Sequence, residues 1–253
     1  MPRRNYCWIL VFIFLHCSIL FQRRSEFEKG LKLYQQSHFY EATIHFNAYY
    51  TKHPDSDTTL YYLYDCYKKL NQPERGARIL EQLARTGSRD DKVYLSLLSY
   101  YHKTSRYQDL YRLLITLDNP IQDSIDERYV LTRQLYAEII CGATTKSVHS
   151  DPIVFAILED YLPSFPDGQT HEHDSITNGN LIILLDKLVE PIYPERFFKM
   201  KNIASSSFLY LPYMRLVHLG IVKFNRELDP EENAPITTAA RAVANLGKRG
   251  FID

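Results

Sequence analysis

Residues 39–46 read FYEATIHF, and two similar segments follow at equal intervals: PERGARIL at residues 73–80 and YQDLYRLL at residues 107–114. The fourth and eighth positions of the three segments are Ala42 and Phe46, Gly76 and Leu80, and Leu110 and Leu114. A fixed period of about 34 residues, with two apolar-periodic runs in each unit, is typical of helical hairpins stacked into a solenoid. The stretch therefore predicts an all-α fold.

The first unit resembles the tetratricopeptide repeat (TPR) in the spacing of Gly30, Leu33, Ala42, Phe46 and Pro54. Gly30 and Ala42 are small where the two helices of a hairpin are expected to cross closely, and Phe46 is expected to fill the gap to the next hairpin. Pro54 has no N–H and cannot continue a helix, so it is expected to end the unit. The resemblance implies a helical-hairpin solenoid.

The resemblance covers about residues 23–118 and implies three TPR-like repeats over residues 25–118, with an unrelated helical bundle as the alternative. Two departures are that no tryptophan opens any unit and that Leu110 is large where a small residue is usual. In that family the first helix of each repeat lines a groove that binds another protein or a peptide segment. The matching residues here are Phe27, Tyr34, Tyr61, Lys68, Lys69, Lys92, His102 and Lys103. This aromatic and basic set suits a partner bearing carboxylates, and a solvated lysine-rich face is the alternative.

The chain beyond residue 118 changes character. Residues 119–146 are interpreted as a capping helix, from about residue 124 to residue 141, followed by a linker. Further on, SIT at residues 175–177 and PIT at residues 235–237 are two copies of one short pattern. Each follows a polar loop and opens a predicted helix with its threonine, Thr177 or Thr237, as the N-cap.

Residues 147–253 are similar to the S-layer homology (SLH) domain, in two helix-loop-helix copies. The matching motifs are FPDG at 165–168, LGIV at 219–222, LDP at 228–230 and PITTAA at 235–240. That family usually works in threes and attaches envelope proteins to cell-wall polysaccharide. Two copies are readable here, and a third, around residues 124–142, is faint. The resemblance implies a small helical module at the end of the chain.

The resemblance also implies that residues opening the two helices contact glycan: Thr177, Asn178, Thr237 and Thr238. The family has an arginine directly after the threonine, and Asn178 and Thr238 stand at that position here. These two side chains can hydrogen-bond neutral groups but cannot pair with a carboxylate as a guanidinium does. A structural module that no longer binds glycan therefore stays the alternative.

Residues 1–24 are predicted to be a signal peptide or a membrane anchor. Two arginines precede an apolar run over residues 6–21, and two more follow it. At the helical rise of ~1.5 Å, such a run spans only ~24 Å, less than the ~30 Å hydrocarbon core of a bilayer. Retention as an anchor, cleavage as a signal peptide and lipidation at Cys17 all stay open. The chain is expected to be exported to the cell envelope, either membrane-anchored or in the periplasm or at the cell surface.

Composition limits the partners. Basic and acidic residues number 30 each, so no global field attracts nucleic acid. Of the four cysteines only Cys66 and Cys141 lie beyond the leader, and they either pair or stay buried thiols.

No motif for catalysis is present: GxxxxGK[ST], GxSxG and HExxH are all absent. The one dense cluster of potential metal ligands, HEHD at residues 171–174, lies in a polar loop without a fixed helical spacing. We therefore predict no enzyme activity, no cofactor and no metal site. The predicted function is a non-catalytic adaptor or scaffold of the bacterial cell envelope that binds a partner segment in the TPR-like groove. The alternative is attachment to cell-wall polysaccharide through the SLH-like module, with the repeats as a spacer.

Overall fold

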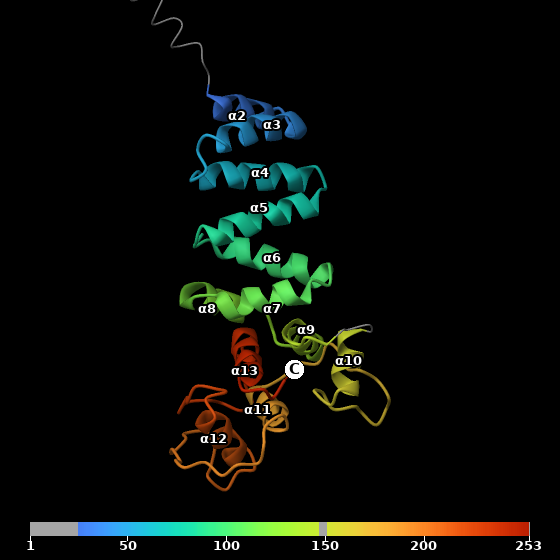
Figure 1. Cartoon of the computed structure of the whole chain (residues 1–253), viewed down its shortest axis with the longest axis vertical. Helices are drawn as coiled ribbons and strands as arrows, with labels where there is room; N and C mark the ends of the chain where they lie inside the picture. The colour runs from blue at the N-terminus through green and yellow to red at the C-terminus, as the bar shows by residue number, and fades with distance from the viewer. Residues whose placement is uncertain (1–24, 147–150, 253) are drawn as a thin grey trace, which may run out of the picture. The chain divides into compact units, whose positions relative to one another are not determined.

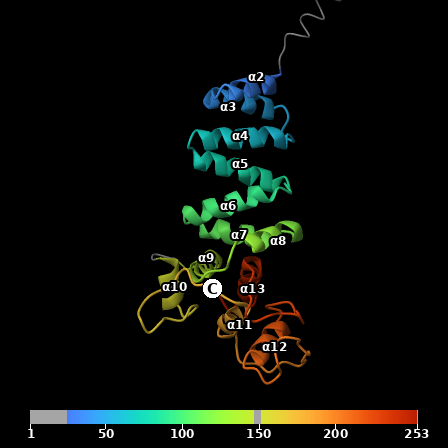
Figure 2. The ribbon, with the colours of Figure 1, turned by 180° about the vertical axis from the view of Figure 1, so that it is seen from behind.

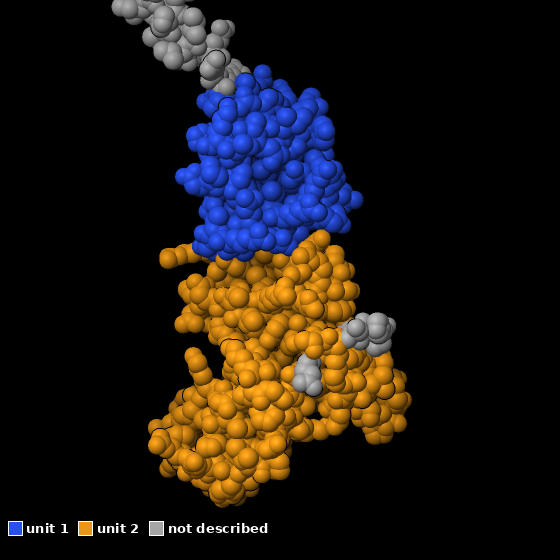
Figure 3. All heavy atoms as spheres, in the orientation of Figure 1, with its two compact units in different colours: residues 1–88 blue, residues 89–253 orange. Residues whose placement is uncertain are grey.

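The computed structural model describes residues 25–146 and 151–252, which form twelve helices, isolated β-bridges and no strand (Figure 1). The all-α prediction is confirmed. The predicted leader, residues 1–24, lies outside the described residues. Among the helices described, none combines the length and the apolar character needed to cross a membrane. The chain divides into two compact units, unit 1 with residues 1–88 and unit 2 with residues 89–253 (Figure 3).

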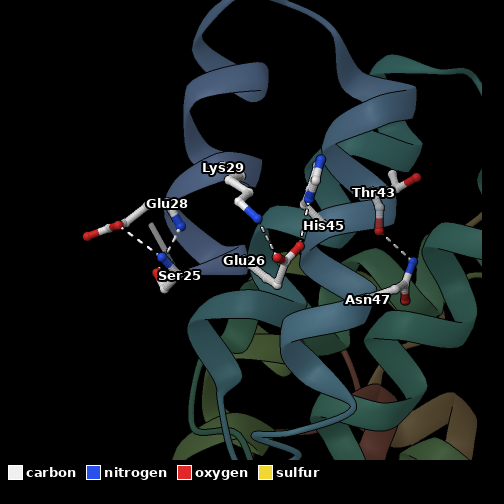
Figure 4. Close-up of polar contacts among 7 residues, drawn as sticks. All are labelled: Ser25, Glu26, Glu28, Lys29, Thr43, His45 and Asn47. Carbon is white, nitrogen blue, oxygen red and sulfur yellow. Dashed lines mark hydrogen bonds and ion pairs between the residues drawn. The ribbon is translucent and has the colours of Figure 1, made fainter. Parts of the chain in front are cut away.

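Residues 25–88, the described part of unit 1, form four helices, each packed against the next in sequence (Figures 1 and 2). They are α2 (Glu26–Gln35), α3 (Phe39–Tyr50), α4 (Asp57–Lys69) and α5 (Pro73–Arg85). A capping box begins α2, because Ser25 Oγ accepts from the backbone N–H of Glu28 while the Glu28 carboxylate accepts from the backbone N–H of Ser25 (Figure 4). These two bonds satisfy backbone donors that the first turn of a helix leaves open.

Glu26 joins the first two helices. Its carboxylate lies 2.7 Å from Lys29 Nζ on α2 and 2.7 Å from His45 Nδ1 on α3 (Figure 4). Hydrogen bonds from Lys29 and then His45 hold the pKa of Glu26 at about 2, because both favour the ionised carboxylate. The two helices are therefore linked by the contact between Glu26 and His45 as well as by packing.

The first hairpin closes around Phe46, which is fully buried on α3. A Cβ atom placed on Gly30 of α2 would lie 2.8 Å from the Phe46 ring, so only glycine permits this approach. On its other side the Phe46 ring stacks on Tyr62 of α4, with centroids 5.2 Å apart. The predictions that Gly30 marks a close helix crossing and that Phe46 reaches the next hairpin are confirmed.

Unit 2 contains eight described helices. They are α6 (Asp91–Lys103), α7 (Tyr107–Thr116), α8 (Asn119–Arg128), α9 (Arg133–Ala143), α10 (Pro152–Leu158), α11 (Asn178–Asp186), α12 (Tyr210–His218) and α13 (Ile236–Lys248). Helix α7 packs against both α6 and α9, and α13 packs against α7, α8 and α9. The end of the chain therefore folds back onto helices that precede residue 147.

The turns α2–α3, α4–α5 and α6–α7 share one backbone geometry. Ser37, Asn71 and Ser105 have φ values of 63°, 53° and 56°, which lie in the left-handed region. In each turn the next residue donates its backbone N–H to a carbonyl oxygen five residues earlier at 2.9 Å. The three turn residues follow one another at the same interval as the three similar segments of the sequence.

The single helix predicted from residue 124 to residue 141 is wrong. Two helices, α8 and α9, occupy this stretch, and residues 129–132 between them are not helical. The reason is tertiary: Val130 forms a β-bridge with Pro235, and the Leu131 carbonyl oxygen accepts from the backbone N–H of Ile176 at 2.8 Å. Backbone groups that would have continued the helix are used by partners far along the chain.

Three short extended segments meet in unit 2 and pair with one another. Besides the bridge between Val130 and Pro235, Thr132 pairs with Ser175, and Thr177 pairs with Asn233. Each segment leads directly into a helix, α9, α11 or α13. The segment at residues 130–132 thus precedes its helix in the same way as the two segments identified from the sequence, at residues 175–177 and 235–237.

The two threonines predicted as N-caps differ in the structure. Thr177 caps α11, since its hydroxyl accepts from the backbone N–H of Asn180 at 3.3 Å. Thr237 lies one residue inside α13 and does not cap it, so that prediction is wrong. Its hydroxyl and its backbone N–H both donate to the carboxylate of Asp126 on α8, at 2.6 and 3.0 Å. A carboxylate from another helix therefore satisfies the donors at this helix start.

Arg215 of α12 forms an ion pair with Asp186 of α11. Arg215 Nη1 lies 2.7 Å from both carboxylate oxygens, and Nε donates to the Ile192 carbonyl oxygen at 2.9 Å. The two side chains are only 13% and 17% exposed. Burial raises the pKa of Asp186 and outweighs the opposing effect of Arg215. The carboxylate thus depends on the guanidinium to stay ionised inside the protein.

Replacing Arg215 by methionine is expected to destabilise unit 2 by about 3 kcal/mol at pH 7, because a buried carboxylate loses its partner. The loss should be smaller at pH 5. Without the guanidinium the folded-state pKa of Asp186 rises further above its unfolded value, so the folded state binds more protons and stability falls as pH rises through that window. Urea unfolding between pH 5 and pH 8 measures the slope.

The matched control carries Asp186→Leu together with Arg215→Met. This double variant has no carboxylate at the site. The extra pH dependence of the free energy of unfolding that Arg215→Met introduces should therefore disappear, and apolar packing should recover part of the stability. If the stability of the single Arg215→Met variant depends on pH in the same way as that of the original protein, Asp186 does not depend on Arg215 to stay ionised.

Candidate binding surfaces

Phe27 and Tyr61, two of the predicted groove residues, are half-buried in unit 1. The Phe27 ring packs against Phe46 and Tyr62, with centroid distances of 5.6 and 5.7 Å. The Tyr61 hydroxyl forms a hydrogen bond with Ser88 Oγ at 3.1 Å. Both side chains therefore hold helices together, and only part of each faces solvent.

Tyr34 links α2 to α4 at the ends of these helices. Its hydroxyl donates to Asp65 Oδ2 at 2.6 Å. This bond raises the pKa of Tyr34 to about 12, since loss of the proton would place a second negative charge beside the carboxylate. Lys68 and Lys69 follow in the last turn of α4, and both are exposed. The structure thus brings Tyr34 and the two lysines to one end of α4, where the ammonium groups are open to an anionic partner.

The other three predicted groove residues lie on α6 in unit 2, and they are not gathered at one point. Lys92 is in the first turn and Lys103 is the last residue of the helix, and both are exposed. His102 Nδ1 lies 2.8 Å from Glu138 Oε2, and the Glu138 side chain is only 3% exposed. The imidazole of His102 is therefore engaged by α9.

Three of the four predicted glycan-contacting residues line two cavities of unit 2: Thr177 lines the first, and Asn178 and Thr238 line the second. Cavity A, of about 440 Å³, is lined by Arg133, Phe165, Asp174, Thr177 and Phe208 among others. Cavity B, of about 500 Å³, is lined by Asn178, Tyr213, Phe224, Asp229, Thr238 and Arg241 among others. Thr237 lines neither of these cavities and is fully buried. Asn178 is also buried and donates from Nδ2 to the Asp229 carbonyl oxygen at 2.8 Å.

Arg133 is the residue of cavity A that sequence reasoning missed. It follows Thr132, the N-cap of α9, as Asn178 follows Thr177. The sequence signal is LTR at residues 131–133, which lies within the faint third copy around residues 124–142. The extended segment at residue 131 makes the equivalence visible, because it pairs with the segments before α11 and α13.

The guanidinium of Arg133 is held from two sides. Nε donates to the Thr170 carbonyl oxygen at 3.0 Å and Nη2 donates to the Pro163 carbonyl oxygen at 2.7 Å. The group also lies 4.5 Å from the centroid of the Phe165 ring. Burial lowers the pKa of Arg133, because the charged form is partly removed from water. The side chain fastens the loop before α11 and lines cavity A at the same time.

The histidine loop is held by pairs between His171 and two aspartates, and the two cysteines beyond residue 24 are buried. His171 Nε2 pairs with Asp167 at 2.7 Å and Nδ1 with Asp174 at 3.3 Å. Among residues 25–146 and 151–252 no three His, Cys, Asp or Glu side chains are grouped as a metal site. Cys66 and Cys141 are free buried thiols, and burial raises their pKa to about 11 and about 12.

Comparison with protein-family models, curated proteins and solved structures found no match to this chain.

Proposed function

We propose that this protein is a non-catalytic adaptor of the bacterial cell envelope. A TPR-like solenoid binds a segment of a partner protein, an SLH-like module follows it, and residues 1–24 direct or anchor the chain at the membrane. The observation that supports this most is the shared turn geometry at Ser37, Asn71 and Ser105. Equal left-handed turns at equal intervals are what a repeated helical hairpin requires.

The binding mechanism is capture of an acidic segment by the end of α4. Lys68 and Lys69 are exposed there, and in the described part of the chain neither forms an ion pair. The bond between Tyr34 and Asp65 joins α2 to α4 and engages the carboxylate of Asp65, which lies on the same helix as the two lysines. A surface that is already ordered loses little conformational entropy when a partner binds.

Reversing both charges, with Lys68→Glu and Lys69→Glu, is expected to reduce capture of the partner at least tenfold. The measurement is crosslinking in intact cells followed by mass spectrometry, which also identifies the partner. A control with Lys52→Glu and Arg78→Glu changes the net charge of unit 1 equally at exposed positions elsewhere. If both double variants lose partner capture equally, or if the Lys68→Glu, Lys69→Glu variant loses none, the end of α4 is not the binding surface.

A second function, attachment to cell-wall polysaccharide through unit 2, is favoured by Arg133. The SLH resemblance implies an arginine after the helix-opening threonine, and Arg133 occupies that place on α9 beside cavity A. Its guanidinium gives one of the three helix openings the cation that Asn178 and Thr238 cannot supply.

Replacing Arg133 by glutamine in the full chain is expected to lower binding to purified cell wall about tenfold or more, since a bond to a charged group is lost. The control Arg128→Gln alters an exposed arginine in the same unit, which pairs with Asp91 at 3.2 Å. Thermal unfolding separates a binding effect from loosening of the loop before α11. Wall binding that survives Arg133→Gln in a folded protein would remove this function.

A further inference from the structure

Unit 2 carries an exposed cluster of aromatic rings beside α12, which we call the aromatic patch. It consists of Tyr193, Phe197, Phe198, Tyr210 and Phe224. Tyr193 is 76% exposed, and the three phenylalanines are between 38% and 44% exposed. Apart from Tyr210, the first residue of α12, the residues of the patch lie in loops and not in helices.

The rings of the patch touch one another in two groups. Phe197 contacts Tyr193 and Tyr210 with centroid distances of 5.4 and 6.1 Å, and Phe198 contacts Phe224 at 4.7 Å. The Tyr210 hydroxyl donates to the Phe198 carbonyl oxygen at 3.0 Å and joins the two groups. Exposed apolar area concentrated in this way marks an interaction surface rather than scattered surface residues.

The loops that carry the rings are held in place. Lys201 donates its backbone N–H to the Arg226 carbonyl oxygen at 3.1 Å, and its ammonium group pairs with Glu227 at 2.6 Å. Asn202 Nδ2 donates to the Glu227 carbonyl oxygen at 2.9 Å. The rings are therefore presented to solvent on an ordered surface and do not need to be arranged on binding.

Cationic residues are interleaved with the rings. Arg196 and Lys199 flank the two adjacent phenylalanines, and Lys223 and Arg226 flank Phe224 and the residue after it. All four are exposed, and within residues 25–146 and 151–252 none of them forms an ion pair. Two acidic residues lie in the same two loop segments, Glu195 and Glu227, and Glu227 is paired with Lys201. Over residues 193–201 and 223–227, five cationic side chains therefore face two carboxylates, so positive charge is in local excess around the apolar rings.

From this charge complementarity we infer that the aromatic patch docks on the surface of a lipid bilayer that contains anionic lipids. Exposed aromatic rings and basic side chains are the combination that binds the interface between headgroups and acyl chains. The inference rests on the proposed location of the chain at a membrane, and it does not depend on the adaptor role.

A polysaccharide fits the patch less well. Two of the three ring contacts are tilted, by 57° and 37°, and only Phe197 and Tyr210 are close to parallel at 17°, so the five rings do not present one flat platform to a sugar. The amide side chains nearby are occupied, because Asn202 donates to a carbonyl group and Asn225 Oδ1 accepts from the Glu227 N–H. Most of the remaining charged groups are cations, which suit phosphate groups of lipids.

The test places a reporter in the patch of the full chain with Phe197→Trp, since Trp8 is the only tryptophan of the sequence. Quenching by brominated acyl chains is compared in vesicles of phosphatidylglycerol and phosphatidylcholine at equal amounts and in vesicles of phosphatidylcholine alone. We expect quenching above the Trp8 background only in the anionic vesicles, and weaker quenching at about 0.5 M salt than at about 0.05 M. Because residues 6–21 are expected to bind any vesicle, quenching of the reporter is measured rather than sedimentation.

Two variants in the Phe197→Trp background test the charges. Lys199→Glu with Arg226→Glu should weaken partitioning about fivefold or more for each reversal. The matched control, Lys52→Glu with Arg78→Glu in unit 1, should leave quenching unchanged. If circular dichroism shows that the reversed variant is unfolded, Lys199→Gln with Arg226→Gln replaces it. A reporter at Tyr40→Trp, on α3 and 58% exposed in the original residue, should show background quenching only.

Several results would overturn the inference. Equal quenching in neutral and anionic vesicles would remove the role of anionic lipids. Quenching no stronger than that of the Tyr40→Trp reporter would remove the membrane contact. A shift in the emission of the Phe197→Trp reporter caused by purified wall polymer, or by protein concentration without lipid, would assign the patch to a glycan or to a second copy of the chain. Partner capture through Lys68 and Lys69 is measured separately, so failure of the adaptor proposal does not imitate any of these results.

Discussion

Replacing Ala42 by arginine should lower the free energy of unfolding of unit 1 by about 4 kcal/mol or more, because a charge enters a closely packed interior. Ala42 is fully buried on α3, which packs against both α2 and α4. The crossing of α2 and α3 nearby cannot accommodate a larger side chain, since even a Cβ at Gly30 would lie 2.8 Å from the Phe46 ring. Urea unfolding followed by circular dichroism measures the change.

The control for this variant is Tyr40→Arg on the same helix. Tyr40 is 58% exposed, so an arginine there can keep its charge in water and should change stability by less than about 0.5 kcal/mol. If Ala42→Arg unfolds at the same urea concentration as Tyr40→Arg, the face of α3 described above is not the buried one. The repeat register read from residues 39–46 would then also fail.

Replacing Gly142 by alanine should destabilise unit 2 by about 3 kcal/mol, although only one methyl group is added. Gly142 lies in α9 where this helix crosses α7. A Cβ there would overlap the carbonyl oxygen of Tyr107 and come within 2.7 Å of the Tyr111 Cβ atom. Both obstacles belong to the backbone or to the base of a side chain, so neither can rotate away. The melting temperature is expected to fall by about 6–12 °C.

Gly247→Ala is the matched control. Gly247 lies in α13 of the same unit, and no heavy atom lies within 4 Å of a Cβ placed on it. Alanine favours a helix interior over glycine, so this variant should be as stable as the original chain or more stable by up to about 1 kcal/mol. If Gly142→Ala and Gly247→Ala have the same melting temperature, α7 and α9 do not approach each other as closely as described.

The helices of unit 1 could be predicted because their signals are local. The constant interval between similar segments, the small residue at position 30 and the apolar residue at position 46 all describe contacts between neighbours in sequence. The sequence does not predict that the Phe27 ring packs against Phe46 and Tyr62. The position of Phe27 on α2 is equally compatible with a residue that lines a groove and with a residue of the core. The division of the predicted site residues between the two units also has no local signal.

Unit 2 was less predictable because its decisive contacts join distant positions. Asp126 and Thr237 are separated by 111 residues, and their bond places the threonine inside α13 rather than at its cap. Likewise Val130 and Leu131 would read as part of a helix, since nothing near them competes for their backbone groups. Arg133 could have been found from its own motif, yet its burial against Phe165 could not.

By itself, the sequence determined that the chain is helical, at which interval similar helices recur and which small residue lets α2 approach α3, because periodicity and residue size act over a few turns of helix. Only the tertiary structure decided that three extended segments pair in unit 2, that Arg133 lies beside cavity A and that five aromatic rings form one surface. Those features depend on hydrogen bonds and ring contacts between residues far apart in sequence, and a linear pattern carries no record of which distant groups meet.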